Sequence, residues 1–140
     1  MKVKRIFLII LVGFMISSNT KAPYKKGIRF FKGSFEEALA KAKEEDKPVF
    51  IDFYASWCGV CKQLKRSTFK DQDAGEYYNN NFINVSIDAE SKEGINIARY
   101  YGVSSYPTLI IADYNGKKIT TTTGFKKPYI LINFGRRVVP

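Results

Sequence analysis

The sequence has 140 residues, which suits a single domain, and 45% of them are hydrophobic and 15% aromatic. A chain of this composition can bury a core and is not expected to be disordered. The formal net charge is +10, of which +6 remains after residues 1–22 are set aside (19 basic against 13 acidic residues). No basic run accompanies a stacking platform or a glycine-rich phosphate loop, so no nucleic-acid partner is expected. The charge fits a solvated surface, or weak attraction to acidic partners or a membrane surface.

The first 22 residues are typical of an export signal. Met1–Arg5 is basic, residues 6–16 form an apolar run, and Thr20 and Ala22 put small residues at the −3 and −1 places of a cleavage site. The apolar run is shorter than the about 20 residues that span a bilayer core. We therefore expect a signal peptide at 1–22, a short arm at 23–33 and a folded domain at 34–140, in the periplasm or otherwise exported. An uncleaved N-terminal membrane anchor is the alternative.

The only two cysteines, Cys58 and Cys61, are three positions apart, and the chain has no histidine. A zinc site normally needs four nitrogen or sulfur ligands, which argues against a single-chain zinc site. A disulfide across so short a loop stabilises by only about 2 kcal/mol in the chain-entropy model. Thiol exchange explains the spacing better, because one cysteine can attack a disulfide and the other can resolve the mixed species. Copper(I) handling and a purely structural disulfide stay as alternatives.

Hydrophobic periodicity and capping signals predict alternating helices and strands. Ser34-x-x-Glu37 is a capping box that starts the first helix. Helices between the first three strands imply parallel neighbours or long crossovers, and Asn115-Gly116 predicts an antiparallel final pair. In chain order we expect helices at 34–45, 62–69, 74–80, 93–101 and 128–134, and strands at 49–55, 82–87, 108–112 and 117–122.

Asp52 is the one charged residue in the otherwise apolar strand 49–55. A carboxylate in an apolar setting has a raised pKa, which suits it to moving protons near neutral pH. An aspartate at a strand edge, facing water, is the alternative. The cysteines stand where this strand ends and a helix starts, and the unpaired N–H groups and dipole of the helix favour a thiolate on Cys58.

The residues around the cysteines are open to two interpretations. Trp57 is either a contact surface beside the thiols or a core aromatic, while Gly59 leaves the turn uncrowded. Lys62, Lys65 and Arg66 either add positive potential near the thiols or form a solvated helix face.

The run from Asp52 to Lys62, DFYASWCGVCK, followed about 45 residues later by Tyr106-Pro107-Thr108, resembles the thioredoxin superfamily. Within it, three further segments resemble the branch typified by the C-terminal periplasmic domain of the DsbD-type thiol:disulfide interchange protein: Lys47-Pro48-Val49, Thr68-Phe69 and Thr123-Gly124-Phe125. The resemblance covers roughly residues 34–134. It implies a thioredoxin-like α/β fold with a central mixed sheet flanked by helices.

The resemblance also implies roles for individual residues. Cys58 would be the exposed nucleophile, Cys61 the buried resolving thiol and Asp52 the buried proton carrier, with the Cys58–Cys61 disulfide as the redox group and no other cofactor. The bond before Pro107 would be cis, facing the cysteines and offering backbone to an extended substrate; a trans proline that starts a strand is the alternative. The residues assigned to substrate binding are Trp57, Gly59, Val60, Tyr106 and Pro107.

Two positions depart from thioredoxin itself. Gly59-Val60 replaces Gly-Pro between the cysteines, so the redox potential need not be that of a general cytosolic reductant. Asn84 stands where thioredoxin has the lysine that accompanies its buried aspartate.

We therefore predict an exported thiol-disulfide oxidoreductase that reduces protein disulfides, since no cation lies between the cysteines to stabilise the thiolate as a strong oxidant requires. Its expected partners are disulfide-containing exported proteins and a membrane or periplasmic electron donor, and the protein is expected to be a monomer. The alternatives are a non-catalytic thioredoxin-fold binding or assembly module, or a Cu(I)-handling dithiol protein.

Overall fold

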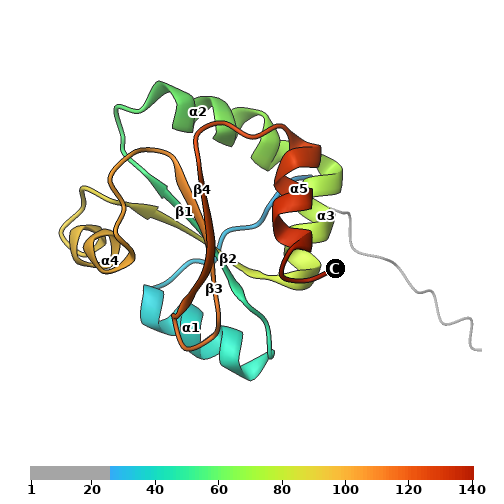
Figure 1. Cartoon of the computed structure of the whole chain (residues 1–140), viewed down its shortest axis with the longest axis horizontal. Helices are drawn as coiled ribbons and strands as arrows, with labels where there is room; N and C mark the ends of the chain where they lie inside the picture. The colour runs from blue at the N-terminus through green and yellow to red at the C-terminus, as the bar shows by residue number, and fades with distance from the viewer. Residues whose placement is uncertain (1–25) are drawn as a thin grey trace, which may run out of the picture.

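The computed structural model describes residues 26–140, so the predicted signal peptide lies outside the described residues (Figure 1). A short 3-10 helix, η1, spans Thr68–Lys70. The other elements, in chain order, are α1 (Phe35–Glu44), β1 (Val49–Tyr54), α2 (Gly59–Arg66), α3 (Gln72–Asn81), β2 (Ile83–Asp88), α4 (Gly94–Tyr101), β3 (Thr108–Ala112), β4 (Lys118–Thr123) and α5 (Pro128–Arg136).

The strands form one four-stranded sheet in the order β2-β1-β3-β4. β1 is parallel to β2 and antiparallel to β3, and β3 is antiparallel to β4. The predicted mixed sheet is therefore confirmed. The connection through α4 is a long crossover, because it returns β3 to the other side of β1 in the opposite direction.

Helices cover both faces of the sheet, as Figure 1 shows. Successive side chains of a strand point to opposite faces, so β1, which is apolar except for Asp52, supplies side chains to two cores. Val49, Ile51 and Phe53 pack with α1 and α4, whereas Phe50 packs with α2, η1, α3 and α5. Asp52 follows Phe50 by two residues in β1, so its side chain points to the same face of the sheet, the face that α2 covers.

The ends of α1 and α2 show how particular residues determine where a helix begins and stops. The capping box of α1 is present, since Ser34 accepts from the backbone N–H of Glu37 and the Glu37 side chain accepts from that of Ser34. The helix predicted at 62–69 begins earlier, at Gly59, because the side chain of Cys58 caps it. It also ends earlier, at Arg66, because the backbone of Ser67 (φ −114°, ψ −83°) leaves the helical region before η1.

Residues 26–33 form an irregular segment that lies against α3, η1 and β2. The backbone N–H of Ile28 donates to Phe69 O (2.7 Å), and that of Phe31 donates to Asn84 O (2.7 Å). A Cβ added at Gly75 of α3 would lie 2.5 Å from the Gly27 backbone. Glycine at position 75 therefore permits the close approach of this segment.

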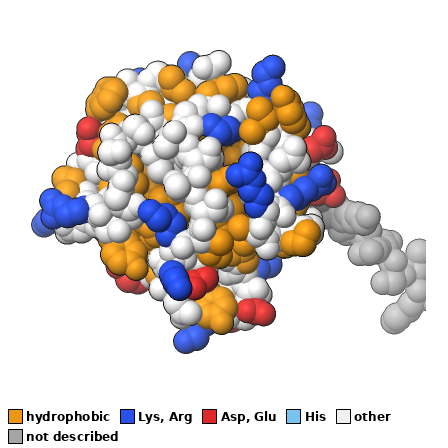
Figure 2. All heavy atoms as spheres, viewed as in Figure 1, with side chains coloured by type: hydrophobic (Ala, Val, Ile, Leu, Met, Phe, Trp, Pro, Cys, Tyr) orange, Lys and Arg blue, Asp and Glu red, His pale blue; other side chains and the backbone are white. Residues whose placement is uncertain are grey.

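On the face drawn in Figure 2, basic side chains occupy several separate places, with hydrophobic side chains between them. None of the helices within residues 26–140 is long and apolar enough to cross a membrane.

Candidate active site

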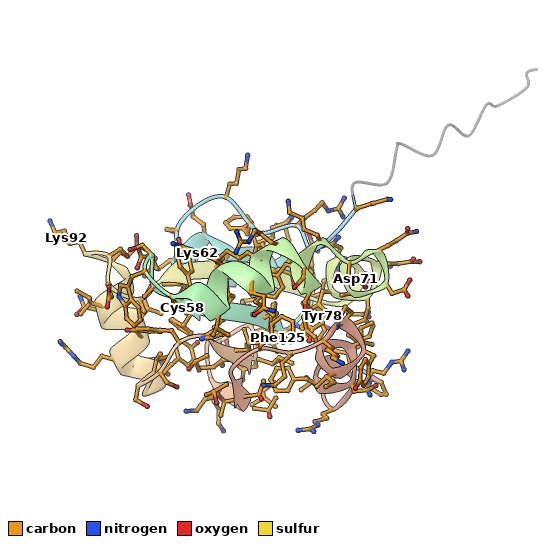
Figure 3. All side chains as sticks on the ribbon, turned by 90° about the horizontal axis from the view of Figure 1, so that it is seen from above. Cys58, Lys62, Asp71, Tyr78, Lys92 and Phe125 are labelled. Carbon is orange, nitrogen blue, oxygen red and sulfur yellow. A yellow bond between two sulfur atoms is a disulfide. The ribbon has the colours of Figure 1, made fainter. Side chains whose placement is uncertain are left out.

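Cys58 and Cys61 are joined by a disulfide at the start of α2, with their Cα atoms 5.3 Å apart. Figure 3 places Cys58 at the first turn of this helix and Lys62 further along it. The backbone N–H of Cys61 donates to Cys58 Sγ at 3.1 Å. An N–H donor and the positive end of a helix dipole both favour negative charge on that sulfur. Once the disulfide is reduced, this geometry favours a thiolate on Cys58 rather than on Cys61.

The implied contrast between an exposed Cys58 and a buried Cys61 is wrong for this disulfide state. Cys58 is 5% exposed and Cys61 2%, so both sulfurs are buried. Tyr54 and Tyr106 pack against the cluster that the two cysteines form with Ala55. The bridge turns each sulfur toward the other, and the packing of Tyr54 and Tyr106 adds to the burial of the two cysteines.

Trp57 is a surface residue, which decides between its two interpretations. Its side chain is 66% exposed, and its ring meets that of Tyr106 edge-on at 6.0 Å between centroids. The indole Nε1–H donates to the Glu90 carboxylate at 3.0 Å. Val60 is also exposed (43%). A Cβ at Gly59 would meet no atom within 4 Å, so crowding does not require glycine there.

The peptide bond between Tyr106 and Pro107 is cis, as the resemblance implied. Pro107 is buried, and its carbonyl accepts from the backbone N–H of Gly124 at 2.9 Å. Tyr106 therefore connects this loop both to the cysteine cluster and to Trp57. Of the predicted substrate-binding residues, Trp57, Gly59 and Val60 are exposed, Tyr106 is half-buried against the cysteine cluster, and Pro107 is buried.

Asp52 is 1% exposed, which supports the buried interpretation over the strand edge facing water. The Ser86 hydroxyl donates to Asp52 Oδ2 at 2.8 Å, while Oδ1 has no partner among the described residues. Burial raises the pKa of Asp52 from 3.8 to about 6, against smaller lowering effects of the Ser86 hydrogen bond and the Lys65 charge. The carboxyl can therefore change its protonation state near neutral pH.

Asn84 does not accompany Asp52 in the structure. It pairs with Phe50 across the sheet, and its Nδ2 donates to the Arg29 carbonyl at 3.3 Å, so it holds residues 26–33 instead. The strand partner of Asp52 is Ser86, and the nearby cation is Lys65 of α2.

Sequence reasoning overlooked Ser86 and Glu90, and it left Lys65 undecided. Lys65 follows Cys61 by four residues, a spacing that puts both on one helix face and could have indicated its position. Ser86 depends on the β1–β2 register, and Glu90 depends on a loop reaching across to Trp57. Within residues 26–140, no three His, Cys, Asp or Glu side chains gather closely enough to hold a metal ion.

Comparison with known proteins agrees with this geometry. A family model described as a thioredoxin-like domain matches residues 35–138. The thiol:disulfide interchange protein DsbD of Pseudoalteromonas atlantica is 34% identical over 95 residues, which cover 65% of this chain and 16% of that protein. The DsbD of Campylobacter jejuni is 30% identical over 112 residues, 79% of this chain and 20% of that protein. The chain thus spans about a fifth or less of the length of these relatives.

Solved structures agree as well. A proposed disulphide-isomerase from Bacteroides thetaiotaomicron has 38% sequence identity and a TM-score of 0.69, with 79% of this chain and 93% of that chain covered. The oxidised C-terminal domain of DsbD from Neisseria meningitidis has 25% identity and a TM-score of 0.62, with 72% and 89% covered. The chain belongs to the thioredoxin-like domain family, and its fold and Cys58–Cys61 disulfide are those of a thioredoxin-like dithiol oxidoreductase.

Proposed function

We propose that this protein is an exported protein-disulfide reductase that works through Cys58 and Cys61. The observation that carries the proposal is the position of the disulfide: it caps α2, lies beside the Tyr106–Pro107 loop, and shares the α2 side of the sheet with buried Asp52. A structural staple would need none of these neighbours, and a three-residue separation makes a weak staple.

The reaction runs in two exchanges. In the reduced protein the Cys58 thiolate attacks a client disulfide; the client S–S bond breaks, a Cys58–client disulfide forms, and one client sulfur leaves as a thiolate. Cys61 then gives its thiol proton to the Asp52 carboxylate and attacks Cys58 Sγ. The Cys58–Cys61 bond forms, the second client thiolate leaves, and two electrons have passed to the client. The disulfide form described above is the product state of this sequence.

An extended client segment fits the surface beside the disulfide. Trp57 and Val60 are exposed there, and Tyr106 borders the same surface from the loop before Pro107. Aromatic side chains with few rotatable bonds supply contact area at small entropic cost, which suits a site that accepts varied sequences.

The proposal includes a compartment and partners. The basic, apolar and small-residue pattern of residues 1–22 supports export. Outside the cytoplasm, regeneration of the dithiol requires a membrane or periplasmic donor of two electrons, and the clients are exported proteins with disulfides. We propose that the protein acts as a monomer.

A trapping experiment tests the exchange. Cys61→Ser leaves Cys58 able to attack but removes the resolving thiol, so mixed disulfides with clients should accumulate and be released by reductant. The control is Cys58→Ser, which keeps the second thiol and should trap far fewer clients. The wild-type dithiol should also reduce insulin. No trapped clients, together with no insulin reduction, would favour the non-catalytic binding module.

The direction of exchange is tested by redox equilibrium with glutathione. No charged side chain lies between the cysteines, so we expect a potential nearer that of thioredoxin, about −270 mV, than that of DsbA, about −120 mV. A potential close to the DsbA value would mean that the protein oxidises its clients.

A further inference from the structure

A cavity of about 310 Å³ lies between residues 26–33, α2, η1 and β2. Three lysines and Ser86 contribute its polar wall, and the remaining lining side chains are apolar; no carboxylate is among them. The lysines are Lys26, Lys65 and Lys70. This basic cavity reaches the α2 side of the sheet, where Asp52 is buried.

Ser86 stands between that cavity and Asp52. Its neighbours Val85 and Ile87 are buried, whereas Ser86 is half-buried and lines the cavity. Its hydroxyl donates to Asp52 Oδ2 at 2.8 Å. A hydroxyl both donates and accepts hydrogen bonds, so it can relay a proton between two partners. Asp52, which is 1% exposed, has almost no solvent contact of its own.

Lys65 differs from the other cations of α2. It is half-buried, whereas Lys62 and Arg66 are exposed. Its Nζ lies 3.0 Å from the centre of the Tyr54 ring, a cation–π contact that holds the ammonium at the wall of the cavity. Burial lowers the pKa of Lys65, and the charge of Asp52 opposes that effect. The two groups therefore stabilise each other's charged forms.

Other charged or titratable groups lie near Lys65 and Asp52, on the elements that pack around them. Lys26 and Lys70 line the cavity from residues 26–33 and η1, and Tyr54 lies on β1 itself. Asp88, at the end of β2, adds negative charge that raises the pKa values of Tyr54 and Lys65. The cavity side is thus predominantly cationic, which opposes the penalty that burial places on the Asp52 carboxylate.

We propose that Lys65 and Ser86 form the solvent side of the Asp52 proton site, with Lys65 as a positioning residue whose charge favours the carboxylate and Ser86 as the relay to the cavity. The inference rests on the proposed exchange reaction for its purpose. As Cys61 attacks Cys58, the Cys61 thiol proton moves to Asp52. In the protonated state the Ser86 hydroxyl turns to accept from the Asp52 carboxyl; the Asp52 proton then passes to Ser86 Oγ while the original Ser86 hydroxyl proton passes to a water molecule in the cavity, which returns Asp52 to the carboxylate.

The role of Lys65 is tested by carboxyl ¹³C NMR titration of the oxidised protein, with the Asp52 signal identified by its loss in Asp52→Asn. Lys65→Met should raise the Asp52 midpoint by roughly 0.5–1 pH unit, because it removes an attractive charge. Lys65→Arg should restore the wild-type midpoint, and Arg66→Met, which removes an exposed cation one position away, should leave it unchanged. An unchanged midpoint in Lys65→Met, or an equal rise in Arg66→Met, overturns the role of Lys65.

The role of Ser86 is tested by the exchange of the protonated Asp52 carboxyl into D₂O, followed by its infrared C=O stretch at about pH 4.5. Ser86→Ala and Ser86→Val should slow the exchange at least about tenfold, because the carboxyl then meets solvent only during local opening. Ser86→Thr keeps the hydroxyl and should exchange as the wild type does. Wild-type rates in a folded Ser86→Ala protein overturn the relay.

Both measurements use the oxidised protein without a client, so they stand apart from the exchange activity. Failure to reduce insulin would refute the proposed reductase and leave the Asp52 titration as measured. An unchanged titration would refute Lys65 alone.

Discussion

Burial of Asp52 should make the oxidised protein less stable as the pH rises. The folded-state pKa of Asp52 is raised from 3.8 to about 6, so between these values the native state binds more protons than the unfolded chain. Stability from this group is complete below about pH 3.8 and is lost as the pH rises through about 6. A difference of about 2 pH units corresponds to about 3 kcal/mol of unfolding free energy.

The assay is urea unfolding of the oxidised wild type and of Asp52→Asn across that pH range. Asparagine is neutral at every pH, so the variant should gain about 3 kcal/mol over the wild type between about pH 3 and pH 8. Any constant cost of the amide cancels, because only the change with pH is compared. Asp73→Asn, which replaces an exposed aspartate of α3, serves as the control and should follow the wild type.

A difference between Asp52→Asn and the wild type that stays constant over this range would refute the reasoning. It would mean that Asp52 does not bind a proton preferentially in the folded protein. Solvent reaching the carboxyl, or a stronger effect of the nearby lysines, would then have cancelled the effect of burial on the pKa of Asp52.

Three further changes test individual contacts, one beside the site and two elsewhere in the fold. Glu90→Ala removes the carboxylate that accepts from the indole of Trp57, the only tryptophan, so its fluorescence anisotropy should fall while stability changes little. Gly75→Ala should cost about 1–3 kcal/mol in urea unfolding, because the new Cβ would overlap residues 26–33, whereas Gly59→Ala has open space and should be near neutral. Tyr78→Phe should cost about 1 kcal/mol in the same assay, because its buried hydroxyl donates at 2.7 Å to a backbone carbonyl of α5.

The features that sequence reasoning predicted are those with local causes. The capping box of α1 and the apolar run of β1 are contiguous signals, and both elements form where these signals stand. Burial of Asp52 followed from the apolar residues on either side of it. The start of α2 differs from the predicted one because cysteine is not one of the residue types that signal an N-cap, yet Cys58 Sγ accepts the backbone N–H of Cys61 as a cap does.

The features that were not predicted depend on pairings between distant segments. Asn84 stands where thioredoxin has the lysine companion of its aspartate, but the structure pairs Asn84 with Phe50 and uses its side chain to hold residues 26–33, while Ser86 lies opposite Asp52. Asn84 and Ser86 are two residues apart and face the same side of the sheet, so only the register between β1 and β2 decides which of them lies opposite the carboxyl. The cation near Asp52 is Lys65, and its position likewise depends on how α2 packs against the sheet. A lysine placed one turn after Cys61 can take this position without any cation on β2, and the environment of Asp52 therefore has to be derived from the packed structure.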